Sequence, residues 1–377
     1  MSSNKITVIG GGNGGHAMAA HKTLDGFRVC FYELPQFAQN VRSVLETRKI
    51  TVEWPTKKET VLIDQVTTDI SVALKDAEIV FVVAPAFGHR AIAELCAPHI
   101  TEGQIICLMP GSGGSLEFAR IFKEKGVNKK AVLAECCTLP YGARLAGAGH
   151  ILIHTEAVVL PTGVFPSVFT KDTIAKLQEI YPAIKSAANV LEAAINNPNP
   201  IVHPVATLLS VTRMEYSKGE FYLYREAMTP AVARCFEALE RERLAILDFL
   251  NLKLHHWDNL DAHGYNLGES LEECHDRILN TSMEASFGAG AIEAGMQMKG
   301  PANMQHRYIT EDVPYGMVLL ATLGRQLGIA TPVTDSVIHL SGAVNRVDYW
   351  ACGRGVEELG IAGLDAKKLL HFLETGD

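Results

Sequence analysis

The first half of the chain alternates short runs of β-branched and aromatic residues with helical patterns. The apolar runs lie at residues 5–10, 28–33, 78–85, 104–110 and 131–135. Runs of this length, uniformly apolar rather than alternating, are typical of strands buried on both faces. Because helical stretches separate them, the pattern predicts a parallel sheet covered by helices on both sides. Residues 150–161 (HILIHTEAVVLP) predict a strand pair near the end of this region.

The pattern changes at about residue 185, where a proline-rich junction (NVLEAAINNPNP) begins. Beyond it, apolar residues recur at helical spacing in 229–252, 313–328 and 334–346. In the first of these helices Glu237 and Arg241 form an i,i+4 pair opposite the apolar stripe. The sequence therefore predicts an α/β parallel-sheet domain over residues 1–190, followed by an all-α domain over residues 191–377.

Composition excludes several classes of protein. The 377 residues carry 34 basic and 42 acidic side chains, a formal net charge of −8, with no basic block that would neutralise nucleic-acid phosphates. No run of about 18 apolar residues predicts a membrane span, and the N-terminal apolar run is too short for a signal peptide. The eight cysteines contain no CxxC pair, so a reducing cytoplasm is expected rather than a disulfide scaffold. The composition therefore favours a protein that acts on small molecules, without nucleic-acid or membrane partners.

A glycine motif follows the first predicted strand. In KITVIGGGNGGHAMAA, Gly10, Gly12 and Gly15 have GxGxxG spacing and open a helix, which is the context of a Rossmann-type dinucleotide site. The three glycines allow a tight turn, close approach of a pyrophosphate and close helix packing. Asn13 and Gly14 complete the candidate phosphate-binding turn, at the positive end of the helix. A glycine-rich turn without a ligand is the alternative.

Glu33 stands at the end of the second strand, eighteen residues after Gly15. A carboxylate there accepts hydrogen bonds from ribose hydroxyls and repels a 2′-phosphate. No Arg or Lys follows in LPQFAQN, so NAD is favoured over NADP. Ala84 and Pro85, after the strand at 78–83, are expected beside the nicotinamide half of the cofactor. A solvated strand end is the alternative for Glu33.

Two stretches of the second domain offer groups for proton transfer. His203 immediately precedes Pro204, and Asp312 lies two residues before Pro314. Because proline favours the first position of a helix, both side chains are predicted at helix N-termini, with Asp312 fixing the tautomer of His203. Arg307, five residues before Asp312, offers a guanidinium that suits a substrate carboxylate. Taken singly, such a histidine is more often structural, and such an aspartate is usually a helix cap.

At these residues the chain resembles the opine dehydrogenase family, which includes octopine and nopaline dehydrogenases. The matching motifs include GGGNGGHAMAA, LMPGSGG, TLPYGAR, NNPNPIVHP, FYLYREAMTPAVARCFEALERER, HRYITEDVPYG, GIATPVTDSVI and GRGVEELGI, spread over most of the chain. The resemblance implies NAD(P)H-dependent reduction of the imine that an amino acid forms with a 2-oxo acid, often pyruvate. It also implies that His203 is the acid/base, that Asp312 is its partner and that Arg307 holds the oxo-acid carboxylate. The remaining substrate-binding candidates that it implies are Ser112, Cys137, Thr138 and Asn199.

Three alternatives remain open. The first is another two-domain reductase of the glycerol-3-phosphate or ketopantoate type, which would use a lysine near the start of the helical domain. Here no lysine occurs between Lys185 and Lys218. The second is a non-catalytic NAD-sensing protein. The third concerns the histidines and aspartates of LHHWDNLDAHG (254–264), for which a solvated loop is favoured over a metal site because no ligand spacing is clear. No metal is expected, and a homodimer is the expected oligomeric state.

Overall fold

The computed structural model describes residues 5–255, 267–277, 296 and 299–377. Its chain divides into two compact units, Met1–Val190 and Leu191–Asp377, each with a hydrophobic core of its own.

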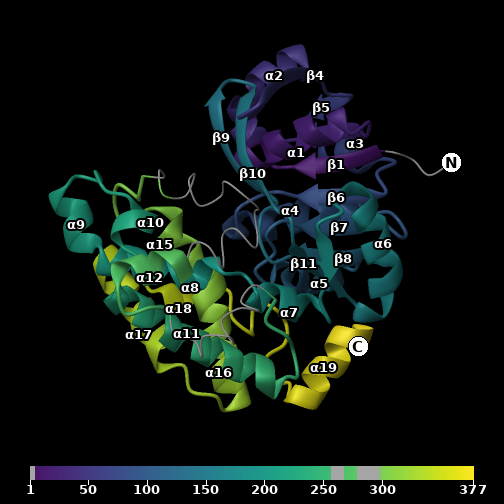
Figure 1. Cartoon of the computed structure of the whole chain (residues 1–377). Coiled ribbons are helices and arrows are strands. Elements are labelled where there is room, and N and C mark those ends of the chain that lie inside the picture. Colours follow the sequence, from purple (N-terminus) through teal and green to yellow (C-terminus); the bar gives the residue numbers. More distant parts are fainter. Residues whose placement is uncertain (1–4, 256–266, 278–295, 297–298) are drawn as a thin grey trace. The chain divides into compact units, whose positions relative to one another are not determined.

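The first unit is built on an eight-stranded, mostly parallel sheet. Figure 1 shows its central strands β1, β6, β7 and β8 side by side. The single antiparallel pair is β11 with β8. Across the sheet the strands are β12 (Ile184–Ser186), β11 (Leu160–Phe165), β8 (Val132–Cys136), β7 (Ile105–Leu108), β6 (Ile79–Val82), β1 (Lys5–Ile9), β2 (Arg28–Tyr32) and β5 (Gln65–Thr67).

A second, four-stranded sheet lies on the other side of helix α1 (Asn13–Leu24). The run Ala17–Ala20 of α1 is fully buried, and its three alanines let the helix pack closely between the two sheets. The predicted strand pair at 150–161 is wrong in its pairing. The two segments do form strands, but they join different sheets, since the first extends a sheet that the sequence pattern did not reveal. The second sheet contains, in order, β4 (Lys57–Leu62), β3 (Lys49–Trp54), β10 (His150–Glu156) and β9 (Tyr141–Gly147).

Short helices complete the first unit, and they connect consecutive strands as a parallel sheet requires. They are η1 (Pro35–Val41), α2 (Arg42–Thr47), α3 (Ile70–Leu74), η2 (Ala86–Gly88), α4 (His89–Cys96), η3 (Ala97–His99), α5 (Gly114–Glu124), η4 (Ser167–Phe169) and α6 (Thr170–Ile180).

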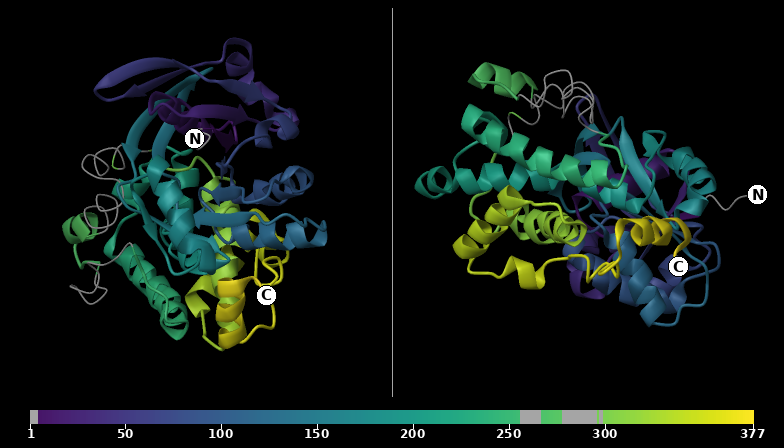
Figure 2. Two further views of the ribbon diagram at one scale, coloured as in Figure 1. Left: turned by 90° about the vertical axis from the view of Figure 1, so that its right-hand side faces the viewer. Right: turned by 90° about the horizontal axis from the view of Figure 1, so that it is seen from below.

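The described part of the second unit is helical, and Figure 2 shows its helices in colours from teal to yellow. The predicted helix at 229–252 is α11, which begins after Thr229, whose hydroxyl accepts from the Val232 N–H at 3.5 Å. The apolar stripe predicted for this helix is buried except for Cys235, which is half-buried. Its buried members are Val232, Phe236, Leu239, Ile246, Leu247 and Leu250. The helices are α7 (Val190–Ile195), α8 (Asn199–Leu209), α9 (Val211–Tyr216), α10 (Leu223–Glu226), α11 (Pro230–Phe249), α12 (Leu271–His275), α15 (Arg307–Thr310), the π-helical turn η7 (Val313–Met317), α16 (Val318–Leu327), α17 (Pro332–Asn345), α18 (Tyr349–Cys352) and α19 (Ala366–Thr375).

Helix α8 corrects one prediction. It begins at Asn199, so His203 lies in its second turn and not at its N-terminus. Pro200 occupies the first turn, where a missing N–H costs nothing because the first N–H groups have no partner within the helix. Pro204 stands inside the helix and removes one backbone hydrogen bond. Burial of the helix around Ile201 and Val205 offsets that loss.

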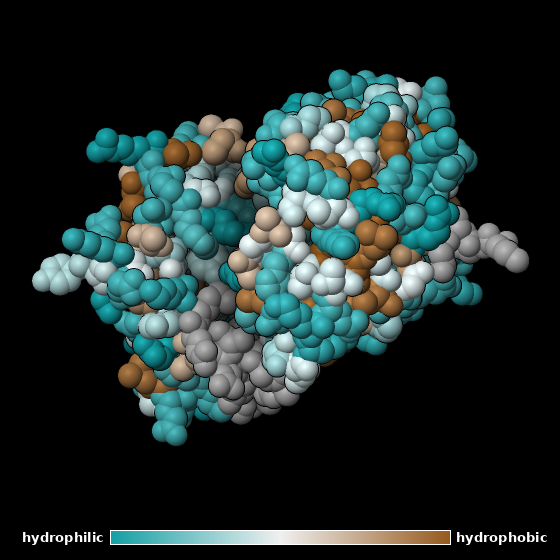
Figure 3. All heavy atoms as spheres, turned by 90° about the horizontal axis from the view of Figure 1, so that it is seen from above, coloured by the Kyte–Doolittle hydropathy of each residue, from teal (hydrophilic) through white to brown (hydrophobic). Residues whose placement is uncertain are grey.

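No described helix has both the length and the apolar character needed to cross a membrane. Seen from above, the surface carries its apolar residues in patches among hydrophilic ones (Figure 3).

Candidate functional site

The glycine loop between β1 and α1 has the geometry of a phosphate cradle. A Cβ on Gly15 would lie 1.7 Å from the Gly10 carbonyl oxygen, so only glycine allows the helix to pack this closely on the strand. A Cβ on Gly12 would meet nothing within 4 Å, which leaves open space in front of its backbone. Gly10 has a φ of +116°, in the region that favours glycine. Two of the glycines therefore shape the loop, and the third keeps its outer side open.

The N-terminus of α1 is suited to an anion. Within the described residues no side chain caps it, and its first turn carries no acidic residue. The Asn13 side chain is turned to the second sheet, where it accepts from the Leu145 N–H at 2.9 Å. Gly14 packs on Leu139 and Val83, which a Cβ would approach to 2.8 Å. The first N–H groups of the helix remain for a pyrophosphate, so the residues present fit a dinucleotide.

Glu33 is tied to this loop. Its carboxylate accepts from the Gly11 N–H at 2.9 Å and from the Leu34 N–H at 2.8 Å. Only 5% of the residue is exposed. Burial raises the pKa of Glu33, and the N–H groups of Leu34 and Gly11 oppose that rise. The structure thus gives this carboxylate a second task, holding the glycine loop, that the sequence did not indicate.

Ala84 and Pro85 follow β6 at the sheet edge where parallel strands end. The Ala84 carbonyl contacts His89 Nε2 at 3.2 Å. His89 is fully buried, and its ring stands edge-on to Phe118 with centroids 6.3 Å apart. Sequence reasoning missed His89, whose position at the start of a helix resembles any polar helix residue.

The loop after β7 carries Ser112, which is buried and has a φ of +50°. The fully buried Glu135 holds this loop by accepting from the N–H groups of Gly113 (2.9 Å) and Ser115 (3.0 Å). Cys137 and Thr138 directly follow Cys136, the last residue of β8.

Cys137 and Thr138 differ in how much surface they offer. Cys137 is fully enclosed in the hydrophobic core, so its thiol offers no surface to a substrate in this conformation. Thr138 is 6% exposed.

In the second unit, the structure brings His203 and Asp312 together. His203 Nδ1 lies 2.8 Å from Asp312 Oδ2, and the two side chains are 11% and 9% exposed. Because an ionised carboxylate only accepts, the Nδ1 atom carries the hydrogen and Nε2 is the acceptor. Asp312 does stand at the N-terminus of η7, but its side chain makes no capping bond and is turned to His203 instead. Helices 109 residues apart in sequence thus build one dyad.

Two tyrosines complete the surroundings of the imidazole. The Tyr308 ring stacks on it, with centroids 3.8 Å apart and planes 22° from parallel. The Tyr224 hydroxyl lies 2.8 Å from His203 Nε2. Sequence reasoning gave neither tyrosine a role, because tyrosines in apolar helical segments are usually core residues. The sequence signal that could have pointed to these tyrosines is their place in the motifs FYLYREAMTP and HRYITEDVP.

Arg307 begins α15, one residue before Tyr308. Its guanidinium pairs with the buried Glu311 at 2.9 Å, while 55% of the Arg307 side chain is exposed. Asn199 opens α8, and its N–H donates to the Asn197 side chain at 3.0 Å.

The segment that leads into α8 is anchored by Arg243. This arginine is buried with Glu240, to which it donates, and it also donates to the carbonyls of Ile195 (3.2 Å) and Asn197 (3.3 Å). The buried pair therefore helps to fix where α8 and its histidine lie.

The segment 254–264, for which the sequence favoured a solvated loop over a metal site, falls mostly outside the described residues, including His256, Asp258, Asp261 and His263. His255 is described, and its Nε2 lies 2.6 Å from Glu192. Within the described residues no group of three or more His, Cys, Asp or Glu could hold a metal.

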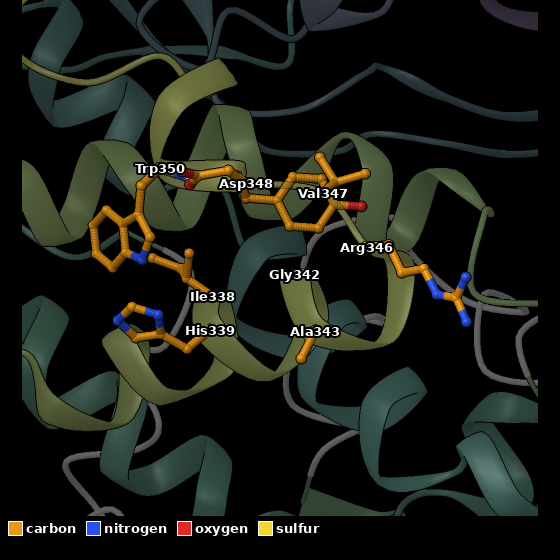
Figure 4. Close-up of a pocket in the computed structure, with 9 residues that line it drawn as sticks. Ile338, His339, Gly342, Ala343, Arg346, Val347, Asp348 and Trp350 are labelled. Carbon is orange, nitrogen blue, oxygen red and sulfur yellow. The ribbon is translucent and has the colours of Figure 1, made fainter.

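A hollow of about 450 Å³ lies on α17 and α18 and contains none of the predicted site residues. Figure 4 shows the Arg346 guanidinium turned away from the Trp350 and His339 rings, so its polar groups do not converge. The hollow is lined by Ile338, His339, Gly342, Ala343, Arg346, Val347, Asp348, Tyr349 and Trp350.

Comparison with known proteins gives matches to both halves of the chain. Residues 186–345 match the family model described as NAD/NADP octopine/nopaline dehydrogenase, alpha-helical domain. Residues 5–127 match that of the NAD-dependent glycerol-3-phosphate dehydrogenase N-terminus. This second match lies within the first domain.

Individual relatives span the whole chain. Opine dehydrogenase of Arthrobacter sp. (strain 1C) is 32% identical over 375 residues, covering 99% of this chain and all of the relative. Octopine dehydrogenase of Mizuhopecten yessoensis is 24% identical, covering 93% of this chain and 94% of the relative. A solved structure of octopine dehydrogenase with NADH and agmatine is 20% identical and superposes with a TM-score of 0.76 over 99% of this chain and 98% of that one. The predicted fold class, a Rossmann-type domain followed by an all-helical one, is confirmed.

Proposed function

Because this chain belongs to the opine dehydrogenase family, we propose that it joins the amino group of an amino acid to a 2-oxo acid, with pyruvate as the first candidate. Membership confirms the predicted enzyme class, an NAD-dependent oxidoreductase that acts on CH–NH donors. Neither of the rival functions, a ketopantoate-type reductase or an NAD sensor, gains support.

The observation that carries the proposal is the buried dyad. His203 donates from Nδ1 to Asp312 at 2.8 Å, which leaves Nε2 able to take a proton. In the proposed reaction this base removes a proton from the substrate ammonium, and the free amine attacks the 2-oxo carbon. A second proton then moves from the attached nitrogen to the former oxo oxygen, which becomes a hydroxyl. The first proton returns to the hydroxyl that leaves as water when the C=N bond forms. NADH, when bound, supplies the hydride that reduces the imine carbon.

The other predicted residues are proposed for binding. Arg307 holds the oxo-acid carboxylate, a role that its fixed and half-exposed guanidinium supports. The glycine loop (Gly10, Gly12, Asn13, Gly14, Gly15) and Glu33 hold the pyrophosphate and ribose of NAD, with Ala84 and Pro85 near the nicotinamide. The substrate-contacting candidates are Ser112, Thr138 and Asn199, and Cys137 is not among them because its thiol is fully buried.

We also propose a cytoplasmic homodimer. All eight cysteines are free thiols, which fits a reducing compartment. Exposed apolar side chains on α17, Leu340 at 55% and Val344 at 43%, fit a surface that a second copy covers.

The proposal is tested by mixing the protein with NADH, pyruvate and a panel of amino acids and following NADH absorbance. At least one amino acid should accelerate oxidation over pyruvate alone, and mass spectrometry should find the N-(carboxyalkyl) product. His203→Gln should abolish this acceleration while NAD still binds. A panel in which no amine accelerates oxidation would sink the proposal.

A further inference from the structure

The second ring nitrogen of His203 already has a partner. Nδ1 donates to Asp312, so Nε2 is an acceptor, and the Tyr224 hydroxyl 2.8 Å away must donate to it. Asp312, His203 and Tyr224 therefore form a chain of hydrogen bonds.

The surroundings of His203 leave few other routes to Nε2. Tyr308 covers one face of the ring, the imidazole side chain is only 11% exposed, and Tyr224 stands with its ring edge-on at 6.3 Å. Asp312 pairs with His203, the Glu311–Arg307 pair lies on the same segment as Asp312, and the His306 ring stands edge-on to Tyr308 at 4.4 Å.

Tyr224 is placed by a short, well-anchored turn. It lies on α10, directly after the fully buried Leu223. The turn is closed by Glu226, which accepts from the Tyr222 N–H at 2.9 Å. The Tyr224 ring itself is only partly buried where it packs against the helical core.

We propose that the Tyr224 hydroxyl relays the proton between His203 and the substrate, an inference that rests on the proposed function. As the substrate ammonium loses a proton, its N–H bond breaks and an O–H bond forms on Tyr224. The original O–H bond of Tyr224 breaks at the same time, and its proton forms an N–H bond on His203 Nε2. The charge ends on the imidazolium, beside the Asp312 carboxylate that stabilises it.

Loss of water uses the same relay in reverse. His203 returns its proton to the Tyr224 oxygen, and Tyr224 gives its own proton to the hydroxyl of the amine–oxo-acid adduct. The C–O bond breaks, water leaves and the C=N bond forms. His203 and Tyr224 together take up one proton and release one proton in each condensation, so the relay needs no further reactant.

The test compares wild type with Tyr224→Phe, which keeps the ring and removes only the hydroxyl. Tyr222→Phe is the matched control, because that ring lies against Arg225, 4.2 Å from its guanidinium, on the same turn. We expect kcat for condensation to fall about 100-fold or more in Tyr224→Phe, with KM for pyruvate unchanged, and to stay within about twofold in the control. The rate should also be measured in mixtures of H₂O and D₂O. A plot of rate against deuterium fraction should be curved for wild type, where two protons move, and linear for Tyr224→Phe.

A second measurement separates this inference from the proposed function. In ¹⁵N-histidine-labelled protein without substrates, Tyr224→Phe should shift the Nε2 resonance of His203, and Tyr222→Phe should leave it in place. If wild type condenses amines but Tyr224→Phe matches or exceeds its kcat, or leaves the Nε2 resonance unmoved, the relay is overturned and the proposed function stands. If wild type condenses no amine, the proposed function itself falls, and the relay with it.

Discussion

Replacing Asp312 by asparagine tests the dyad with the smallest change in shape. The carboxylate and imidazole meet at 2.8 Å, and both side chains are about nine-tenths buried, so solvent screens their attraction only weakly. The substitution removes the charge that stabilises the imidazolium. The new amide NH₂ group can also donate to Nδ1 of His203, which moves the ring hydrogen to Nε2. A histidine that carries its hydrogen on Nε2 can no longer act as the base there.

General acid–base catalysis accounts for about 10²–10⁴ in rate. We therefore expect kcat of Asp312→Asn to fall by that factor, about 3–5 kcal/mol in activation free energy. The fall should stop there, because hydride transfer and the Arg307 contact remain.

The assay is steady-state NADH oxidation with pyruvate and the most active amino acid, with kcat and KM determined separately. KM for pyruvate should change little, since Arg307 and its partner Glu311 are untouched. Asp335→Asn is the control, because Asp335 forms an exposed ion pair with Arg325 on another helix. A kcat of Asp312→Asn within about threefold of wild type would refute the reasoning that Asp312 sets the tautomer and stabilises the charge.

Three further predictions concern the glycine loop, cofactor choice and a buried ion pair. Gly12→Ala should keep the wild-type unfolding temperature but should lower the affinity for NAD measured by calorimetry. Gly15→Ala, whose Cβ would lie 1.7 Å from a carbonyl oxygen, should lower both the unfolding temperature and the affinity. An equal fall in unfolding temperature in the two variants would contradict this contrast. Glu33→Gln should weaken NAD binding about tenfold and should reduce the preference for NAD over NADP. If the ratio of the dissociation constants for NAD and NADP stays unchanged, Glu33 does not contact the ribose. Arg243→Met leaves Glu240 buried without its cation and should lower the free energy of unfolding, measured in urea, by about 3–5 kcal/mol. The double variant Arg243→Met with Glu240→Met should lose less. If the single variant is as stable as the double variant, the buried pair does not contribute as argued.

The nucleotide loop of the first unit and the candidate dyad of the second unit were predictable from the sequence to different extents. The glycine loop was predictable because its determinants are local: a strand, a turn and a helix within some twenty residues, with glycine where a Cβ would clash. Glu33 was predictable in position but not in its second role, since its bond to the Gly11 N–H depends on how β2 packs beside β1.

The pair proposed for proton transfer, His203 and Asp312, was predicted from motifs rather than from geometry. Proline spacing placed His203 at a helix start, whereas α8 begins one turn earlier. The error arose because Pro200 and Pro204 are equivalent in local preference, and burial of the helix decides which of them lies inside it.

The sequence by itself predicted the strand–helix order, the nucleotide loop, the family and the two residues proposed for proton transfer. These are local or motif-borne properties, fixed by residue type and spacing. Only the tertiary structure decided that Tyr224 and Tyr308 enclose the imidazole, that Arg243 holds the segment before α8, and that β10 leaves the main sheet for a second one. Each of these contacts joins residues distant in sequence, and no local pattern specifies which buried tyrosine or arginine will meet which partner once the helices pack.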